Sequence, residues 1–256
     1  MIRYIPADPA GNLTAIVLSP VAAQDRAKIA AEMMARCPEG FEQVGFADET
    51  SLTGDLPTLC MMGGEFCGNA TRAFACYAAK VRGRGETRLA VSVSGAREPV
   101  PVAVDLRQNR AYAQMPLPYA LEWISVNKQK IPLVRMEGID HALLLDAVPS
   151  PEAAERVLAA MPKQDARGVL FVQGGKMTPL VEVAATGTRV WESSCGSGTV
   201  ALAWYLAQNL ADGMHAFAFD EPGGRLEARV AMRAERAAQI EMGGAVKLGK
   251  EAEIEL

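Results

Sequence analysis

Two cysteines in closely similar surroundings are the residues of this sequence best suited to proton chemistry. Cys67 opens the stretch CGNATRAFACYAAK, and Cys195 opens the stretch CGSGTVALAWYLAQ. Aligned without gaps, the two stretches share seven of fourteen residues, and they begin 128 positions apart in a chain of 256. A repeat of two similar halves, each carrying one cysteine, is therefore the first hypothesis about the organisation of the chain.

Each of these cysteines stands where the pattern predicts the start of a helix. The residues that follow are small or polar, as is typical of a chain turning into a helix: Gly68 and Asn69 in one copy, Gly196 and Ser197 in the other. The free backbone N–H groups and the helix dipole favour an anion there, either a thiolate or a substrate carboxylate. We therefore expect each helix start to lower the pKa of its thiol toward neutral pH.

A pair of thiols could invert a carbon atom that bears a hydrogen. Inversion needs a base on one face of the carbon and an acid on the other, and a thiolate and a thiol meet that demand. The two groups exchange roles when the reaction runs backwards, which two matching halves would suit. The alternative from a different class is a non-catalytic amino-acid binder or a thiol-redox protein, in which Cys67 and Cys195 would form a disulfide. The other cysteines are expected to be buried small hydrophobes.

Composition and charge exclude several other classes. The formal net charge is −4 without a basic cluster, which argues against nucleic acid and anionic membranes as partners. No stretch of eighteen apolar residues and no signal-peptide pattern occurs, so the expected location is the cytoplasm. There is no CxxC motif, and His141 and His215 are the only histidines, so no metal site is expected. Both histidines are interpreted as core or edge residues.

Short strands and a few helices make up the predicted elements. Helices are expected at 25–36, 68–81 and 150–161 and directly after Cys195, and most other segments have the pattern of strands. The helix that follows each cysteine is so apolar that a sheet would have to enclose it. The predicted fold class is α+β, with two pseudo-symmetric domains, each a curved sheet or barrel around a central helix.

The expected domain boundary lies near the middle of the chain. The first domain is predicted to span 1–116, to carry Cys67 and to regain a C-terminal strand at about 247–256. The second is predicted to span 117–246 and to carry Cys195, with an active cleft between the two domains.

The two cysteine motifs resemble those of the diaminopimelate epimerase family of cofactor-independent amino-acid epimerases and racemases. EFCGNATRA is similar to the first motif of that family and ESSCGSGTVALA to the second. PAGN and GFEQVGF resemble two segments that contact substrate, which carries substrate contacts over to Asn12 and Gln43. The resemblance covers most of the chain. It implies Cys67 and Cys195 as the acid–base pair, no pyridoxal phosphate, helix starts that hold the α-carboxylate, a small amino acid as substrate and a homodimer.

The chain departs from the epimerase proper where the far end of the substrate would bind. It has Ile139, Asp140 and His141 in place of Asn-Pro-His, Leu180 in place of an Asn, and no Arg beside Glu192. An Arg and amides would bind the second carboxylate and amine of diaminopimelate. Because this chain lacks them at these positions, diaminopimelate is the alternative substrate and not the preferred one. The shortened loop before the second cysteine is closer to the histidine-racemase branch, which supplies D-histidine for metallophore synthesis.

Two acidic residues are candidates for contacting a basic or imidazole side chain. Glu192 is favoured over Glu65, because the family places a Glu in that region of the chain. An isomerase of the related phenazine-biosynthesis type is disfavoured, because it does not use the paired cysteines.

Overall fold

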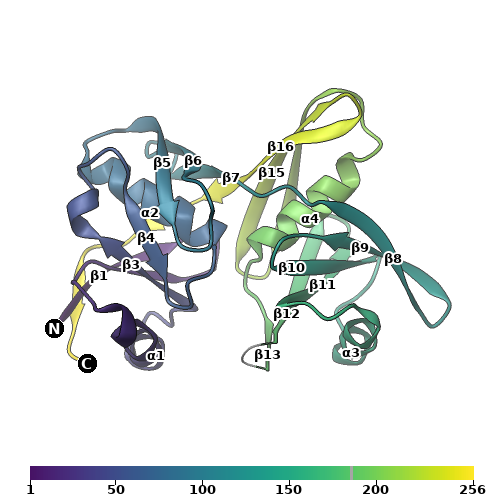
Figure 1. Ribbon diagram of the computed structural model, residues 1–256, viewed down its shortest axis with the longest axis horizontal. Coiled ribbons are helices and arrows are strands. Elements are labelled where there is room, and N and C mark those ends of the chain that lie inside the picture. The colour runs from purple at the N-terminus through teal and green to yellow at the C-terminus, as the bar shows by residue number, and fades with distance from the viewer. Residues whose placement is uncertain (185–186) are drawn as a thin grey trace. The chain divides into compact units, whose positions relative to one another are not determined.

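The fold is mixed α+β and is dominated by sheet. A computed structural model describes residues 1–184 and 187–256, and the chain divides into two compact units (Figure 1). Unit 1 comprises Met1–Gln114 together with Gly243–Leu256, and unit 2 comprises Met115–Met242. Within the described residues, no helix is both long and apolar enough to cross a membrane.

Unit 1 is a sheet with one helix on each face. Strand β1 pairs with β2, with β17 and with β18, and the pairing then runs from β2 through β3, β4, β5 and β6 to β7. The strands are β1 (Ile2–Asp8), β2 (Thr14–Val17), β3 (Gln43–Asp48), β4 (Thr58–Met61), β5 (Glu86–Val93), β6 (Val100–Asp105), β7 (Arg110–Gln114), β17 (Lys247–Leu248) and β18 (Ala252–Ile254). The α-helices are α1 (Arg26–Arg36) and α2 (Gly68–Val81), and two 3₁₀ turns are η1 (Ala23–Asp25) and η2 (Glu49–Ser51).

Unit 2 is likewise built from strands and two α-helices. Its strands are β8 (Ala120–Val126), β9 (Gln129–Arg135), β10 (Ile139–Leu145), β11 (Ala166–Gln173), β12 (Lys176–Val183), β13 (Thr188–Trp191), β14 (Gly213–Glu221) and β15 (Gly224–Arg233). Strand β16 (Arg236–Ala245) begins in unit 2 and ends in unit 1. The helices are α3 (Pro151–Ala160) and α4 (Gly196–Ala207).

The two units follow the same order of strand pairings. In unit 1 the pairs β1–β2, β3–β4 and β5–β6 are antiparallel, and β2–β3 and β4–β5 are parallel with a helix in each crossover. In unit 2 the pairs β9–β10, β11–β12 and β14–β15 are antiparallel, and β10–β11 and β12–β14 are the parallel pairs that α3 and α4 connect. Strand β13 is an addition to this order in unit 2.

Alternation along the strands decides which helix each side chain meets. Successive side chains of a strand point to opposite faces of the sheet. In β10, Ala142 and Leu144 pack in the cluster that contains α3, so His141 and Leu143 face the opposite side, where α4 lies. In unit 1, Ile16 of β2 likewise packs in the cluster around α2 while its neighbours in β2 pack with α1. The apolar helices α2 and α4 are therefore the central helices of their units.

The predicted helices are confirmed at all four places. Helix α2 has the expected bounds, and Ser150 caps α3 by accepting a hydrogen bond from the Ala153 N–H. Strand β9 was not expected, because Pro132 and a polar first half obscure its pattern.

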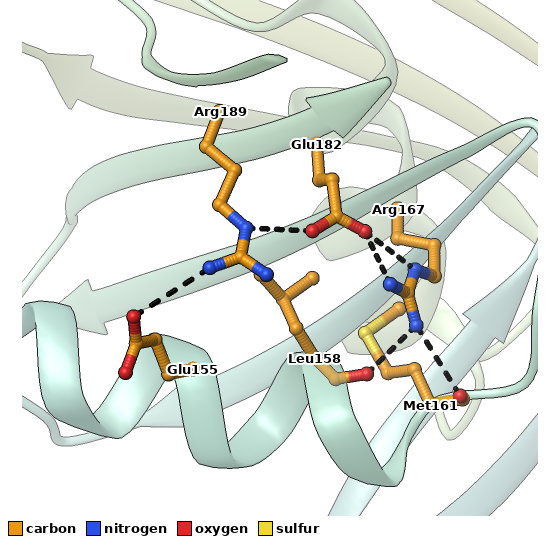
Figure 2. A network of polar contacts seen from close by, with 6 residues as sticks. All are labelled: Glu155, Leu158, Met161, Arg167, Glu182 and Arg189. Carbon is orange, nitrogen blue, oxygen red and sulfur yellow. Dashed lines mark hydrogen bonds and ion pairs between the residues drawn. The ribbon is translucent and has the colours of Figure 1, made fainter. Parts of the chain in front are cut away.

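A network of polar side chains fixes α3 to the sheet of unit 2 (Figure 2). Arg167 donates to the carbonyl oxygen of Leu158 at 2.8 Å, near the end of α3, and also to the carboxylate of Glu182. Arg189 donates to the other oxygen of Glu182 at 2.6 Å. These bonds, first from Arg167 and then from Arg189, lower the pKa of Glu182.

The lowered pKa of Glu182 predicts a pH-dependent contribution to stability. A carboxylate with a lowered pKa in the folded state stabilises the fold above its unfolded pKa, and this stabilisation is lost as the pH decreases through the folded pKa. We expect Glu182→Gln to reduce the free energy of unfolding by about 1–3 kcal/mol at pH 7, and the difference from wild type to shrink below about pH 5, as the pH decreases toward the unfolded pKa. Urea unfolding at pH 7, 5 and 4 measures this.

Glu155→Gln is the matched control, because the Glu155 side chain is 70% exposed and lies 3.6 Å from Arg189 in the same network. Its effect is expected to stay within about 0.5 kcal/mol. A Glu182→Gln difference that is constant from pH 7 to pH 4 would contradict the assignment.

Candidate active site

Cys67 caps the N-terminus of α2. Its backbone is extended (φ −129°, ψ 112°), and its sulfur accepts a hydrogen bond from the Ala70 N–H at 3.4 Å. The carbonyl oxygen of Cys67 accepts the first helical bond from the Thr71 N–H at 2.9 Å and a second bond from the Thr71 hydroxyl at 2.7 Å. The sulfur is therefore held against the start of the helix.

Cys195 caps α4 in the same way. Its backbone angles are φ −121° and ψ 104°, its sulfur accepts from the Gly198 N–H at 3.4 Å, and its carbonyl oxygen accepts from the Thr199 N–H at 2.9 Å. The two motifs that match in sequence thus have the same local geometry. Gly198 allows this close packing, because a Cβ atom would lie 2.9 Å from the Leu170 side chain and 3.2 Å from the Cys195 sulfur.

The first N–H groups of each helix are suited to binding an anion. The first turn of an α-helix has N–H groups without helical partners. In the part of the chain that the structure describes, the backbone N–H groups of Gly68, Gly196 and Ser197 donate to no protein acceptor. They can receive a carboxylate oxygen. Asn69 is buried and accepts from the Arg72 guanidinium at 2.8 Å through its side chain.

The expected lowering of the thiol pKa values is wrong for the unliganded protein. Burial raises the pKa of the Cys67 thiol above its ordinary value, although donors from Ala70, Gln43 and Asn69 oppose this. The pKa of Cys195 is raised further, by burial and by the carboxylates of Glu192 and Glu221. The helix starts are present, but the loss of water around the sulfurs has the larger effect.

Unit 1 brings Asn12, Gln43 and Cys67 together. Gln43, which begins β3 and is 8% exposed, donates to the Asn12 side-chain oxygen at 2.6 Å and to the Thr14 hydroxyl at 2.7 Å. Asn12 in turn donates to Glu42 at 2.9 Å. Gln43 also lies near enough to the Cys67 sulfur to lower its pKa. Thr14 was not predicted, because a threonine at a strand start has no distinctive sequence signal.

A buried arginine holds this part of unit 1 in place. Arg72 of α2 is fully buried and donates to the carbonyl oxygens of Pro9, Ala111 and Gly244 at 3.3–3.4 Å, as well as to Asn69. The guanidinium therefore connects the turn before Asn12, strands β7 and β16 and the helix that follows Cys67.

Unit 2 places Ser197 and His141 beside Cys195. The Ser197 hydroxyl lies 3.5 Å from the Cys195 sulfur and 2.9 Å from Nε2 of His141. The imidazole is fully buried, its Nδ1 atom has no hydrogen-bond partner among residues 1–184 and 187–256, and burial lowers its pKa to about 3. His141 is therefore neutral. Its ring occupies the space over Gly168, where a Cβ atom would lie 2.1 Å from Nδ1.

Two glutamates lie near Cys195, and only one was predicted. Glu192 is partly buried three residues before Cys195, and its charge raises the pKa of the thiol. Glu221, at the end of β14, is 7% exposed and accepts from the Cys195 N–H and the Thr199 hydroxyl, both at 2.6 Å. Glu221 lies 26 residues after Cys195 in a strand, so local sequence gave no signal for it. His215, in contrast, is bonded to the Ala211 carbonyl oxygen away from this group.

The fold is shared with several solved structures. A probable proline racemase from Agrobacterium radiobacter K84 matches with a TM-score of 0.66 and 15% identity over 100% of this chain and 93% of that one. A putative phenazine biosynthesis PhzC/PhzF protein from Clostridium difficile matches with a TM-score of 0.68 and 13% identity, with both chains fully covered. At these identities the likeness shows the fold: a mixed α+β fold of the PhzF and proline racemase type.

Sequence comparison defines the family more narrowly. A histidine racemase of Fusobacterium nucleatum subsp. nucleatum is 31% identical over 221 residues, which cover 80% of this chain and 81% of that protein. The family model described as the histidine racemase CntK N-terminal domain matches residues 1–254. The chain belongs to this family and is an isomerase of the racemase class.

Proposed function

We propose that this protein racemises histidine by a cofactor-independent mechanism that uses two thiols. The observation that carries the proposal is the matched geometry of Cys67 and Cys195, each a helix cap whose sulfur accepts one N–H bond at 3.4 Å. Histidine as substrate is supported by the relatives, which are histidine racemases. Diaminopimelate is the weaker candidate, because Leu180 is an apolar residue where a polar grip on the second carboxylate and amine is needed.

In the proposed mechanism the two thiols act on opposite faces of the α-carbon. A thiolate removes the α-proton, and the other thiol delivers a proton to the opposite face. The α-carboxylate accepts bonds from the N–H groups of Gly68, Gly196 and Ser197, which have no protein partner among the described residues. These donors stabilise the negative charge that spreads onto the carboxylate when the α-proton leaves.

Substrate binding helps to form the thiolate. Burial raises both thiol pKa values in the unliganded protein, and a substrate with an α-ammonium group brings a positive charge next to the sulfurs. An opposite charge at about 4–6 Å favours the ionised form of a neighbouring group. The thiolate is then formed mainly when a substrate is present.

The remaining polar residues are assigned to recognition and positioning. We assign substrate contacts to Asn12 and Gln43, which are already oriented by their mutual hydrogen bond, and to Asn69. Glu192 is the candidate for the imidazole side chain, with Glu65 as the alternative. Glu192 is supported by its effect on the pKa of Cys195, which places its charge near that thiol.

We also propose that the two units are pseudo-symmetric domains of the diaminopimelate epimerase type. The shared order of pairings and the matched caps of α2 and α4 support this proposal. A homodimer, as the family resemblance implies, and a cytoplasmic location complete the proposal.

Exchange of the α-proton in D₂O tests the proposed function. The reduced protein is incubated with L-histidine, D-histidine, diaminopimelate and a panel of other L-amino acids, and the α-proton signal is followed by NMR. We expect histidine to lose this signal at least about 100-fold faster than diaminopimelate. Faster exchange of diaminopimelate would replace the substrate assignment, and no exchange with any of them would favour the binding or redox alternative.

A further inference from the structure

Glu221 makes the surroundings of Cys195 unlike those of Cys67. One carboxylate oxygen of Glu221 accepts the backbone N–H of Cys195 at 2.6 Å, and the other accepts the Thr199 hydroxyl at 2.6 Å. A group that accepts a donor at each oxygen has the bonding pattern of an ionised carboxylate. A negative charge is therefore held at the first turn of α4, directly behind the thiol.

The main chain fixes this carboxylate in position. Glu221 is the last residue of β14 and lies opposite Gly224 in the tight turn to β15. Within that turn, the Gly223 N–H donates to the carbonyl oxygen of Ser193 at 2.7 Å. The turn that carries Glu221 is thus bonded to the loop that carries Cys195, and the side chain is 7% exposed.

The start of α2 has no such charge. Thr71 occupies the position that Thr199 has in α4, but its hydroxyl donates to the carbonyl oxygen of Cys67 and not to an acidic side chain. Among the described residues, no carboxylate accepts the backbone N–H of Cys67. Within the described residues, the matched caps therefore differ in that a carboxylate is bonded to the backbone N–H of Cys195 but not to that of Cys67.

The other groups around the two sulfurs also disfavour a thiolate more at Cys195 than at Cys67. Cys195 faces the carboxylates of Glu192 and Glu221, while His141 on β10 is neutral and reaches it only through Ser197. Cys67 is surrounded mainly by donors, and Glu65 is the smallest influence on its thiol. A nearby negative charge disfavours a second one in a buried site.

We propose that Glu221 is a positioning residue that keeps Cys195 in the thiol form, so that Cys67 is the residue that supplies the thiolate. This inference rests on the proposed two-thiol racemisation. In the forward step the Cys67 sulfur forms an S–H bond as the C–H bond breaks. The Cys195 S–H bond breaks as the new C–H bond forms. The step leaves a Cys195 thiolate beside Glu221, which disfavours it. Cys195 then takes up a proton from solvent and the Cys67 thiol releases one, which restores the starting form.

The test measures the protonation of each thiol without turnover. The reduced protein is alkylated with iodoacetamide from pH 6 to pH 11, and the extent of modification of Cys67 and Cys195 is read by peptide mass spectrometry. In the wild-type protein we expect the midpoint of Cys195 to lie higher than that of Cys67. Glu221→Gln should shift the Cys195 midpoint toward acid by about one pH unit, with the Cys67 midpoint unchanged.

Glutamine is the appropriate replacement, because its oxygen can accept the Cys195 N–H while its NH₂ group donates to the Thr199 hydroxyl. Asp220→Asn is the matched control, since it removes a charge from the adjacent, 57% exposed side chain. It is expected to leave both midpoints in place. A Cys195 midpoint that Glu221→Gln does not change would overturn the proposal.

If Glu221→Gln does not fold, the alkylation midpoints of the two thiols in the wild-type protein test the proposal. A Cys195 midpoint at or below that of Cys67 also overturns the proposal. A failure of the proposed function appears separately, as the absence of α-proton exchange.

Discussion

Replacement of Cys67 or Cys195 by serine is expected to lower kcat/KM for racemisation by at least about 1,000-fold, because a general acid or base contributes about 10²–10⁴-fold and a hydroxyl ionises far less readily than a thiol. Each variant should keep one partial reaction. With one thiol left, the enzyme can remove and return the proton on one face only. We expect α-proton exchange without inversion for one enantiomer in Cys67→Ser and for the opposite enantiomer in Cys195→Ser.

NMR in D₂O combined with polarimetry separates exchange from inversion. Cys60→Ser is the control, because Cys60 is a partly buried cysteine in β4, outside both helix caps, and it should retain wild-type turnover. Wild-type turnover in both Cys67→Ser and Cys195→Ser would exclude the two-thiol mechanism. Activity that appears only when Cys67 and Cys195 are oxidised to a disulfide would instead support the redox alternative.

Substitution of Gly168 by alanine is expected to reduce the free energy of unfolding by about 1–3 kcal/mol, the usual cost of overpacking a buried site. In an ordinary strand the same change would stabilise the fold by roughly 0.5–1 kcal/mol. The sign reverses here because the new Cβ atom would lie 2.1 Å from Nδ1 of the fully buried His141. The displaced ring should also release Ser197, so racemase activity should decrease with stability.

A double-mutant cycle measures this contact. In a His141→Ala background the space over Gly168 is open, so the further change Gly168→Ala should cost less than about 0.5 kcal/mol, and the difference between backgrounds is the coupling energy. Gly85→Ala is the control, because the nearest atom to its Cβ is an Arg107 side-chain nitrogen at 3.8 Å. Equal costs of Gly168→Ala in both backgrounds would show that the ring is not what restricts this position.

The local elements could be predicted from the sequence because their signals are local. The helix after Cys67 is bounded by a cap pattern and a Gly-containing breaker, and Ser150 with Pro151 marks the start of α3. The two cysteine motifs are similar over fourteen residues, so the equivalence of Cys67 and Cys195 could also be predicted. Periodicity and capping were sufficient for these features because each depends on residues within one or two turns.

The contacts that determine the chemistry of the thiols could not be predicted, because they join segments far apart in the chain. His141 reaches Ser197 across 56 positions, and Glu221 reaches Cys195 across 26. Neither residue stands in a motif, and an isolated histidine in an apolar strand is usually a core residue. The expected direction of the thiol pKa shift was wrong for a related reason. A helix start is visible in the sequence, but the burial of the sulfurs depends on tertiary packing.

The pairing of β1 with β18 has a consequence for how the chain is made. Ile2 lies opposite Ile254, so β1 cannot complete its pairing until β18 has been synthesised. The residues of unit 2, in contrast, are contiguous from Met115 to Met242. Domains generally fold during synthesis in the order in which they leave the ribosome. Here the order is reversed, because all residues of unit 2 are synthesised before the C-terminal segment of unit 1. On a translating ribosome, the sheet of unit 1 remains open at β1 until β18 emerges.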